Sequence, residues 1–316
     1  MNHVSRRITT MAGVLLLATA AGCGTRDTPS AEPAVVFAAG SLARPLRAAL
    51  DTIAASGGPA VKLEIMGSRE LLRAVTSLGR TPDLIVTADA DELERTLMPS
   101  HVTSSTTFAR NRVVLALSRT FAARERITRA NWADMASMGR MRIARTDPAR
   151  APLGYRTQLV WQLAESALQR PGLARRLAAA SPDALLRGNE SDLAALLESG
   201  DADAAWCYES LARSLGLPYV TLGDAIDLGS DADSLRYRAV MVRVSGDAPG
   251  DSLSMRGTPI RYAIAVLANG RDVAGATILR ERLLDSTSVR VMRRIGLDML
   301  DTPRVVSVTG TSRRAP

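Results

Sequence analysis

The sequence predicts an α/β fold, because short apolar strands, glycine-containing turns and helices follow one another in a repeated order. Val35–Ala38 is an apolar strand, and after a turn Leu42–Ala55 carries apolar residues at helical spacing. The same order returns when Val61–Met66, which alternates like a strand, leads into a helix that begins near Ser68. Strands that alternate with helices form βαβ units, and such units place their strands parallel in one sheet.

Further elements follow along the chain. We expect strands at 83–87, 112–118, 142–144, 204–208, 235–244 and 262–267. We expect helices at 90–97, 155–167, 191–197, 274–284 and 288–295. The last stretch, 303–316, is expected to form a weakly ordered tail. The 316 residues suffice for two lobes with separate cores, because domains usually comprise about 100–200 residues.

The N-terminal segment has the pattern of an export signal. Arg6 and Arg7 precede an apolar stretch over Met11–Ala21, which is too short to span a bilayer as a mature helix. Small residues then lead to Cys23. This pattern resembles a bacterial lipoprotein signal, so we expect a signal peptide over 1–22, a tether over 23–34 and lipidation of Cys23. An ordinary secretory signal with an incidental cysteine is the alternative.

The composition argues against nucleic-acid binding and against several kinds of catalysis. The formal net charge is +8, but the arginines are scattered among acidic residues, and aromatic residues make up only 3% of the chain. His101 is the single histidine after the signal segment, which nearly excludes His-based triads and His-rich metal sites. The sequence also lacks a Gly-x-Ser-x-Gly elbow and a Walker A run. We therefore expect a binding protein and not an enzyme.

Two serines follow glycines where predicted helices begin, in the pairs Gly40–Ser41 and Gly67–Ser68. A helix N-terminus offers unpaired backbone N–H groups and a partial positive charge. Two such termini that meet at one point would form a receptor for an oxyanion. Serine is also a common N-cap residue, so simple capping of the two helices is the alternative.

These turns, together with other segments in the same order, are similar to the molybdate- and tungstate-binding proteins of ABC transporters. The similar segments are Phe37–Leu42, Gly67–Ser68, Pro82–Asp89, Phe108–Asn111, Asn131–Trp132, Asp147–Pro148, Pro152–Arg156 and Thr258–Tyr262. The resemblance implies a type II periplasmic-binding-protein-like fold, in which two mixed sheets flanked by helices are joined by two crossover segments. It implies a first lobe over 35–116 and 239–302, a second lobe over 117–238, and crossovers near 112–118 and 237–244.

The resemblance also implies five residues that bind the oxyanion. Ser41 and Ser68 would supply hydroxyl and backbone donors, Leu153 and Glu190 would supply backbone amides, and Tyr208 would supply its hydroxyl. Such neutral donors would replace the hydration shell of a tetrahedral dianion, without a cofactor and without direct ligation of the metal by a side chain. The carboxylate of Glu190 is expected to point away, because it would repel an anion.

The chain departs from the archaeal tungstate-binding branch at two positions. In that branch two carboxylates bring the metal to six-coordination, and here Ala151 and Cys207 stand at those positions. The departure predicts an ion that is held tetrahedrally by hydrogen bonds alone, with an affinity that is independent of pH near neutrality. Arg69, Arg73 and Arg156 lie near the turns in sequence and could steer anions by their long-range field.

The resemblance therefore implies high-affinity extracytoplasmic binding of molybdate or tungstate and delivery of the ion to an ABC permease. The protein would be a monomer, anchored through the lipid on Cys23 to a bacterial membrane, in the periplasm or at the cell surface. The alternative within this class is a receptor for sulfate, phosphate or another small anion. The alternative outside it is a hydrolase on the same two-lobed scaffold.

Overall fold

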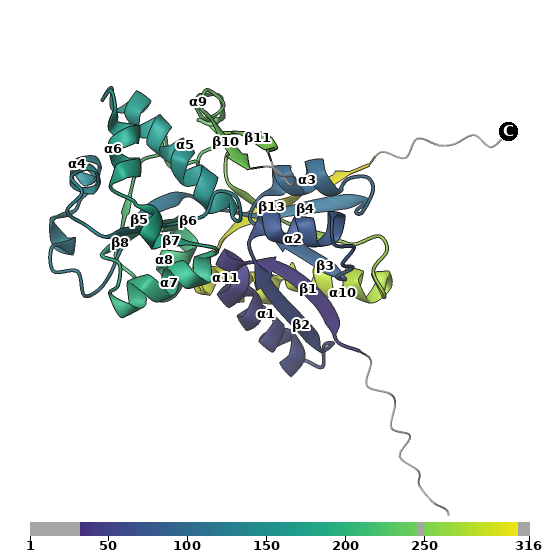
Figure 1. The fold of residues 1–316 in the computed structure, drawn as a ribbon. Helices are drawn as coiled ribbons and strands as arrows, with labels where there is room; N and C mark the ends of the chain where they lie inside the picture. Colours follow the sequence, from purple (N-terminus) through teal and green to yellow (C-terminus); the bar gives the residue numbers. More distant parts are fainter. Residues whose placement is uncertain (1–31, 246–249, 309–316) are drawn as a thin grey trace, which may run out of the picture. The chain divides into compact units, whose positions relative to one another are not determined.

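The computed structural model describes residues 32–245 and 250–308, which form two β-sheets flanked by helices (Figure 1). The first sheet has the strand order β13-β4-β12-β3-β1-β2, and the second has the order β7-β6-β8-β5-β9. The strands of the first sheet are β1 (Ala34–Ala39), β2 (Val61–Met66), β3 (Leu84–Thr87), β4 (Ser104–Arg110), β12 (Arg261–Val266) and β13 (Asp298–Ser307). Those of the second are β5 (Val113–Leu117), β6 (Ile143–Thr146), β7 (Leu186–Arg187), β8 (Ala204–Tyr208) and β9 (Tyr219–Thr221).

Each sheet has its own set of helices (Figure 1). The first sheet packs with α1 (Ala43–Ala55), α2 (Ser68–Thr76), α3 (Ala90–Leu97), α10 (Val273–Leu283) and α11 (Ser286–Arg294), and together they are the first lobe. The second sheet packs with α4 (Trp132–Ser137), α5 (Pro152–Ala167), α6 (Leu173–Ala179), α7 (Glu190–Ser199) and α8 (Glu209–Leu215), and together they are the second lobe. Short 3₁₀ turns lie at Gly40–Leu42, Arg124–Arg126 and Asp183–Leu185. The strands β10 (Met241–Ser245) and β11 (Ser252–Arg256) pair only with each other within the described ranges and form the ribbon.

Both sheets are mixed, as expected. In the first sheet β1 runs parallel to β2 and β3, and β12 runs antiparallel to β3 and β4. In the second sheet β6 runs parallel to β7 and β8, whereas β5 runs antiparallel to β8 and β9. The parallel pairs matter for the site, because their carboxyl ends lie at one edge of each sheet.

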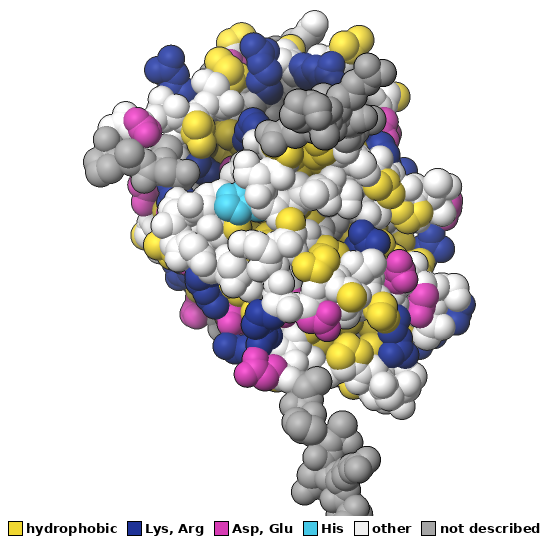
Figure 2. Space-filling view, turned by 90° about the vertical axis from the view of Figure 1, so that its right-hand side faces the viewer, with side chains coloured by type: hydrophobic (Ala, Val, Ile, Leu, Met, Phe, Trp, Pro, Cys, Tyr) yellow, Lys and Arg dark blue, Asp and Glu magenta, His cyan; other side chains and the backbone are white. Residues whose placement is uncertain are grey.

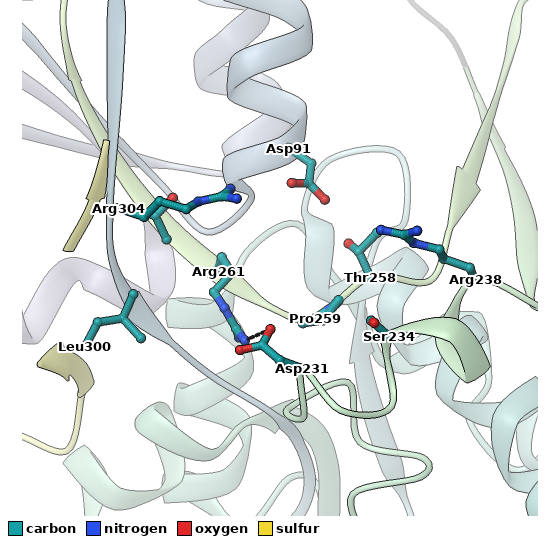
Figure 3. Close-up of a pocket in the computed structure, with 10 residues that line it drawn as sticks. Asp91, Asp231, Ser234, Arg238, Thr258, Pro259, Arg261, Leu300 and Arg304 are labelled. Atoms are coloured by element: carbon teal, nitrogen blue, oxygen red, sulfur yellow. Dashed lines mark hydrogen bonds and ion pairs between the residues drawn. The ribbon is translucent and has the colours of Figure 1, made fainter. Parts of the chain in front are cut away.

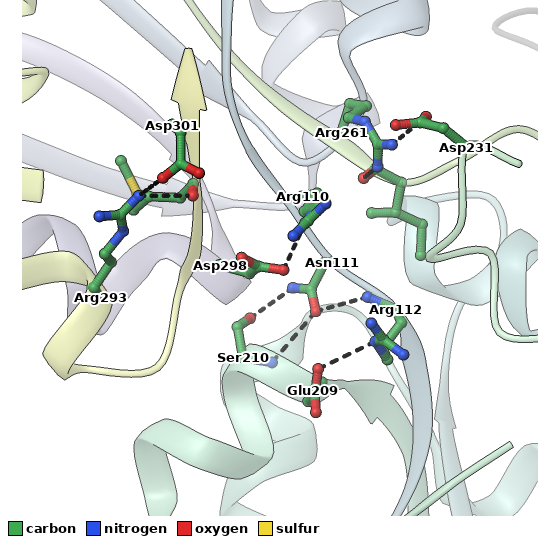
Figure 4. Close-up of polar contacts among 12 residues, drawn as sticks. Arg110, Asn111, Arg112, Glu209, Ser210, Asp231, Arg261, Arg293, Asp298 and Asp301 are labelled. Atoms are coloured by element: carbon green, nitrogen blue, oxygen red, sulfur yellow. Dashed lines mark hydrogen bonds and ion pairs between the residues drawn. The ribbon is translucent and has the colours of Figure 1, made fainter. Parts of the chain in front are cut away.

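The chain passes from the first lobe to the second at Asn111–Arg112 and returns between the end of the ribbon and Arg261. The two crossings are adjacent, since the backbone amide of Asn111 donates to the Ile260 carbonyl at 3.3 Å. Figure 4 shows Asn111 at the first crossing, with Arg110 and Arg112 on either side. The expected boundary at residue 116 is wrong, because all of β5 belongs to the second sheet. The return path begins after α9 (Ser234–Tyr237), within the expected crossover near 237–244, and it is longer than expected, because the chain forms β10 and β11 before it re-enters the first sheet at β12.

Two expected elements differ from those observed. The predicted strand over 235–244 is a helical turn, α9 (Ser234–Tyr237), followed by β10; Tyr237 is buried and its hydroxyl donates to the Asp224 carbonyl, while Leu235 is exposed. The predicted tail from residue 303 is ordered through Ser307, because this stretch pairs with β4 as part of β13. The signal segment, Cys23 and residues 309–316 lie outside the described residues.

The strands that carry the second lobe's half of the site are fully buried. Every residue of β5 and β8 is buried, and Trp206 of β8 packs edge-to-face against Trp132 and Trp161 with ring centroids 5.9 Å and 6.0 Å apart. This packing fixes the end of β8, where Tyr208 lies. On the surface, basic and acidic side chains lie interspersed over the face that Figure 2 shows, in keeping with the scattered arginines of the sequence. Within the described ranges, no helix has both the length and the apolar composition needed to cross a membrane.

Candidate functional site

The two Gly–Ser turns leave the first sheet side by side. Residue Ala39 at the end of β1 pairs with Met66 at the end of β2, so the turns that follow both strands begin at the same level. Neighbouring strands lie about 4.8 Å apart, which sets the spacing of the two turns. Ala88, which follows β3 on the other side of β1, lies at this edge as well. In α/β sheets this edge, outside the carboxyl ends of the strands, is where ligands bind.

The second sheet presents a matching edge. Its parallel strands β6 and β7 lead into the N-termini of α5 and α7, and β8 ends at Tyr208. The first amides of a helix have no partner inside the helix, and no side chain caps α5, so the Leu153 amide has no capping partner. Asn189 caps α7 through the Asp192 amide and not through the Glu190 amide.

The two edges are in contact, and glycine is required where they meet. A Cβ atom on Gly40 would lie 2.6 Å from Oε2 and 3.3 Å from the amide nitrogen of Glu190. A Cβ atom on Gly67 would overlap the Arg150 carbonyl and lie 3.6 Å from the Ala151 nitrogen. The structure is therefore a closed form, in which the turns of the first lobe touch the helix starts of the second. It places all five expected residues, Ser41, Ser68, Leu153, Glu190 and Tyr208, on these facing edges, and all five are buried.

The neighbours of the Ser41 hydroxyl fix it as an acceptor toward the protein. Asn111 Oδ1 accepts from the Arg112 amide at 2.9 Å (Figure 4). The side-chain nitrogen of Asn111 must therefore be the donor to the Tyr262 hydroxyl, at 2.6 Å. Tyr262 in turn donates to Ser41 Oγ at 3.1 Å. Ser41 accepts from this chain of donors, and its own proton is left to donate elsewhere.

The hydroxyls of Ser68 and Tyr208 are oriented in the same way. Ser68 Oγ accepts from the Ala88 amide at 3.0 Å. Arg156 Nη1 donates to the Ala88 carbonyl at 2.6 Å and to the Tyr208 hydroxyl at 2.8 Å, and a guanidinium has no acceptor. The protons of Ser68 and Tyr208 are therefore also left for another partner. Neither Ser41 nor Ser68 caps its helix through its side chain, so the capping alternative is wrong.

The carboxyl of Glu190 was expected to point away from the site, and this expectation is wrong. It lies against Gly40, it is 1% exposed, and neither of its oxygens has a hydrogen-bond partner within residues 32–245 and 250–308. Burial raises the pKa of this carboxyl to about 7, while its own backbone amide and the charge of Arg156 act to lower it. A titratable group therefore lies among the donors, and binding that is independent of pH is no longer expected.

Cys207 does not face the site. Side chains alternate along a strand, so the thiol lies on the face of β8 opposite to the ring of Tyr208. It is fully buried near the backbone of Ala116 and Ala212, and burial raises its pKa to about 12. Its identity therefore does not decide whether a carboxyl reaches the ligand. Cys207 replaces the carboxylate of the tungstate-binding branch, as expected, whereas the carboxyl of Glu190 lies at the contact between the two edges.

Two of the arginines that were expected to steer anions are buried in ion pairs. Arg69 pairs with Glu92 at 3.1 Å and is 3% exposed, and Arg156 pairs with Asp89 at 3.2 Å and is 2% exposed. Buried and neutralised charges contribute little to a long-range field. The roles of Arg156, Asn111 and Tyr262 in orienting hydroxyls were missed, although all three belong to segments on which the resemblance rests.

A hollow of about 460 Å³ lies outside this cluster (Figure 3). Arg261 pairs there with Asp231, and Arg304, Arg238 and Asp91 surround the remaining space. None of the five expected ligand residues lines it. The candidate site is therefore the closed contact between the two edges and not this open hollow.

Comparison with known proteins finds a matching family, similar chains and a similar fold. The model of a family described as bacterial extracellular solute-binding protein matches residues 34–298. A Haloferax volcanii protein described as an ABC transporter molybdenum-binding protein is 35% identical over 251 residues, 78% of this chain and 76% of that protein. A molybdate/tungstate-binding protein of Thermococcus kodakarensis is 26% identical over 327 residues, 93% of this chain and 91% of that protein. The structure of the periplasmic molybdate-binding protein of Azotobacter vinelandii superimposes with a TM-score of 0.59 at 14% identity, over 84% of this chain and 98% of that one, which confirms the expected fold.

Proposed function

The chain belongs to the bacterial extracellular solute-binding protein family, and on that premise we propose that it binds molybdate or tungstate between its two lobes. The names of two relatives support this choice of ligand. The observation that carries it is the shared polarity of the hydroxyls of Ser41, Ser68 and Tyr208, each of which accepts from a donor of the protein and keeps its proton for a ligand. An anion without protons accepts at every oxygen and fits such a set.

We propose that the backbone amides of Leu153 and Glu190 complete the set of donors from the second lobe. Both residues lie in the first turn of helices of 16 and 10 residues, whose N-termini carry a partial positive charge. Together with Tyr208 they would face the two serines of the first lobe. Fixed dipoles on both sides would then replace the water around the ion.

The carboxyl of Glu190 takes part in its protonated form. An ionised carboxylate beside a doubly charged anion would be repelled, whereas a carboxylic acid donates a hydrogen bond to an anion oxygen. The raised pKa of about 7 supports this state, and a bound dianion would raise the pKa further. The protein would then hold the ion tetrahedrally by hydrogen bonds, and six light-atom neighbours in an X-ray absorption spectrum would contradict it.

Delivery to an ABC permease, attachment through a lipid on Cys23, a monomeric state and the absence of catalysis are parts of the same proposal. Against a hydrolase, the described contacts give neither serine a general base. Ser41 is bonded to the Tyr262 hydroxyl and Ser68 to the Ala88 amide. A serine nucleophile needs a neighbouring base such as histidine to remove its proton.

Calorimetric titration of the purified protein with molybdate, tungstate, sulfate and phosphate tests the proposal. We expect molybdate or tungstate to bind most tightly. Ser41→Ala and Ser68→Ala should each weaken binding by about 1–3 kcal/mol, the cost of a lost donor to a charged group, with the fold intact. Ser56→Ala, which changes an exposed hydroxyl at the end of α1, is the matched control. Absence of binding for all four anions, or tighter binding of sulfate or phosphate, would overturn the choice of ligand.

A further inference from the structure

Arg69 is the residue after Ser68 in the first turn of α2, and its guanidinium enters the second lobe. Its Nη1 atom lies 3.3 Å from the carbonyl oxygen of Ala149 and 3.5 Å from that of Pro148, in the loop that follows β6. Its Nη2 atom donates to the carbonyl of Ser245 at the end of β10, at 3.1 Å. A guanidinium has five donors in a rigid fork, and this one uses them in three directions.

The charge of Arg69 is held by the first lobe itself. Its Nε donates to Glu92 of α3 at 3.1 Å, and both side chains are almost completely buried. The ion pair lies within one lobe and does not depend on closure. The contacts with the Pro148 and Ala149 carbonyls, by contrast, join the first lobe to the second, so they exist only when the lobes are together, and the contact with Ser245 joins the first lobe to the ribbon.

We propose that Arg69 is a positioning residue that holds the closed form through these carbonyls, without touching the ligand. The inference rests on the proposed function, because closure around an anion is what the contacts would stabilise. Ser68 and Arg69 are consecutive, so one helical turn presents the ligand donor and the interlobe contact together. The ribbon is part of the same device, since Arg69 binds Ser245 on one side, and Gln162 of α5 donates to the Met241 carbonyl on the other at 3.2 Å.

The expected effect is on release of the ligand. When the lobes separate, the guanidinium loses its carbonyl acceptors, whereas the open protein already keeps the Glu92 pair. Hydrogen bonds from a charged donor change an equilibrium by roughly tenfold to a hundredfold. Removal of the guanidinium should therefore speed dissociation by that factor and leave the association rate within about threefold.

The test is stopped-flow measurement of association and dissociation for whichever of the four anions the wild-type protein binds. Arg69→Met should dissociate about 10–100 times faster, and Arg69→Lys should fall between it and wild type, because an ammonium group is a point donor and not a fork. Since Arg69→Met leaves Glu92 buried without its cation, the double variant Arg69→Met/Glu92→Gln is included and should show the same fast release. Glu92→Gln alone removes the ion pair and keeps the guanidinium, so it should release the anion more slowly than Arg69→Met does.

Arg80→Met is the matched control, because Arg80 is an arginine of the first lobe whose ion pair, with Glu64 at 2.8 Å, stays within that lobe. A purely structural role for Arg69 would lower the melting temperature of the ligand-free protein and leave the dissociation rate unchanged. That result in Arg69→Met and in the double variant would overturn the proposal while the proposed function stands. If wild type binds none of the anions, the proposed function fails, and the role of Arg69 is tested by solution scattering instead. An unchanged radius of gyration in Arg69→Met would overturn the proposal that Arg69 holds the closed form, and a larger one would support it.

Discussion

At the scale of single residues, the direction of each hydroxyl proton decides what the site can bind. The backbone sets that direction: the Arg112 amide fixes the orientation of the Asn111 side chain, and Asn111 then donates through Tyr262 to Ser41. No charge on Asn111 is involved. The neutral side chain of Asn111, at the crossing between the lobes, therefore fixes which way the Ser41 hydroxyl donates.

Asn111→Asp tests this transmission. A carboxylate has no donor, so the Tyr262 hydroxyl would turn to donate to it and Ser41 would lose its orienting partner. We expect calorimetry to show binding weakened by about 1–3 kcal/mol, with the fold retained by circular dichroism. Asn131→Asp makes the same change of charge in an exposed turn where Asn131 has similar contacts, and it should bind like wild type. Equal effects of the two variants would refute the transmission.

Glu190→Gln tests the protonated carboxyl. The pKa of Glu190 is raised to about 7 in the closed form, so the closed form binds a proton that the open, solvated carboxyl releases above about pH 4.5. Affinity should therefore be highest at low pH and should fall, by at most tenfold per pH unit, between about pH 4.5 and the closed-form pKa of about 7. In Glu190→Gln, a permanent neutral donor, the affinity measured by calorimetry from pH 5.5 to 8.5 should be high and flat. Loss of binding in this variant would refute a neutral donor at this position.

At the scale of elements, the site is made by strand ends and helix starts that face each other. Much of this could be predicted from the sequence, because the spacing of apolar residues that marks a strand or a helix is a local property. The observed β2, α3 and β8 have the expected bounds, β1 is one residue longer at each end, and α1 begins one residue later than expected. The strand predicted from residue 235 was wrong, because Tyr237 is bonded to Asp224 in a helical turn. The spacing of apolar residues along 235–244 does not reveal a contact with a residue outside that segment.

Gly67→Ala tests whether the facing elements must close. The backbone of Gly67 has φ −66° and ψ 143°, which alanine adopts without strain, so the lobe itself should tolerate the change. The added Cβ would overlap the Arg150 carbonyl only when the lobes are together. We expect the melting temperature of the ligand-free protein to change by less than a few degrees and the affinity to fall at least tenfold.

The matched control is Gly270→Ala in the same lobe, where the nearest heavy atom to a new Cβ is the Leu267 carbonyl oxygen at 3.2 Å. It should leave both quantities near wild type. An unchanged affinity in Gly67→Ala would mean that binding does not require the observed contact between the lobes.

At the scale of the whole molecule, closure depends on contacts between residues far apart in the sequence. Arg156 reaches Ala88 across 68 positions, and Arg69 reaches Ala149 across 80. The resemblance placed Ser41 and Ser68 near a ligand, but no local pattern could show that these two arginines are buried between the lobes. Nor could it show which carboxyl enters the site, since that depends on which face of β8 and which end of α7 meet the first lobe.

The Glu190 carboxyl can also change from donor to acceptor. With its proton it suits a guest that carries no hydrogen of its own. Without the proton it would repel a dianion. The receptor would then keep its ion in acidic surroundings and give it up more readily in alkaline ones, so the acidity around the cell would act on the supply of this nutrient.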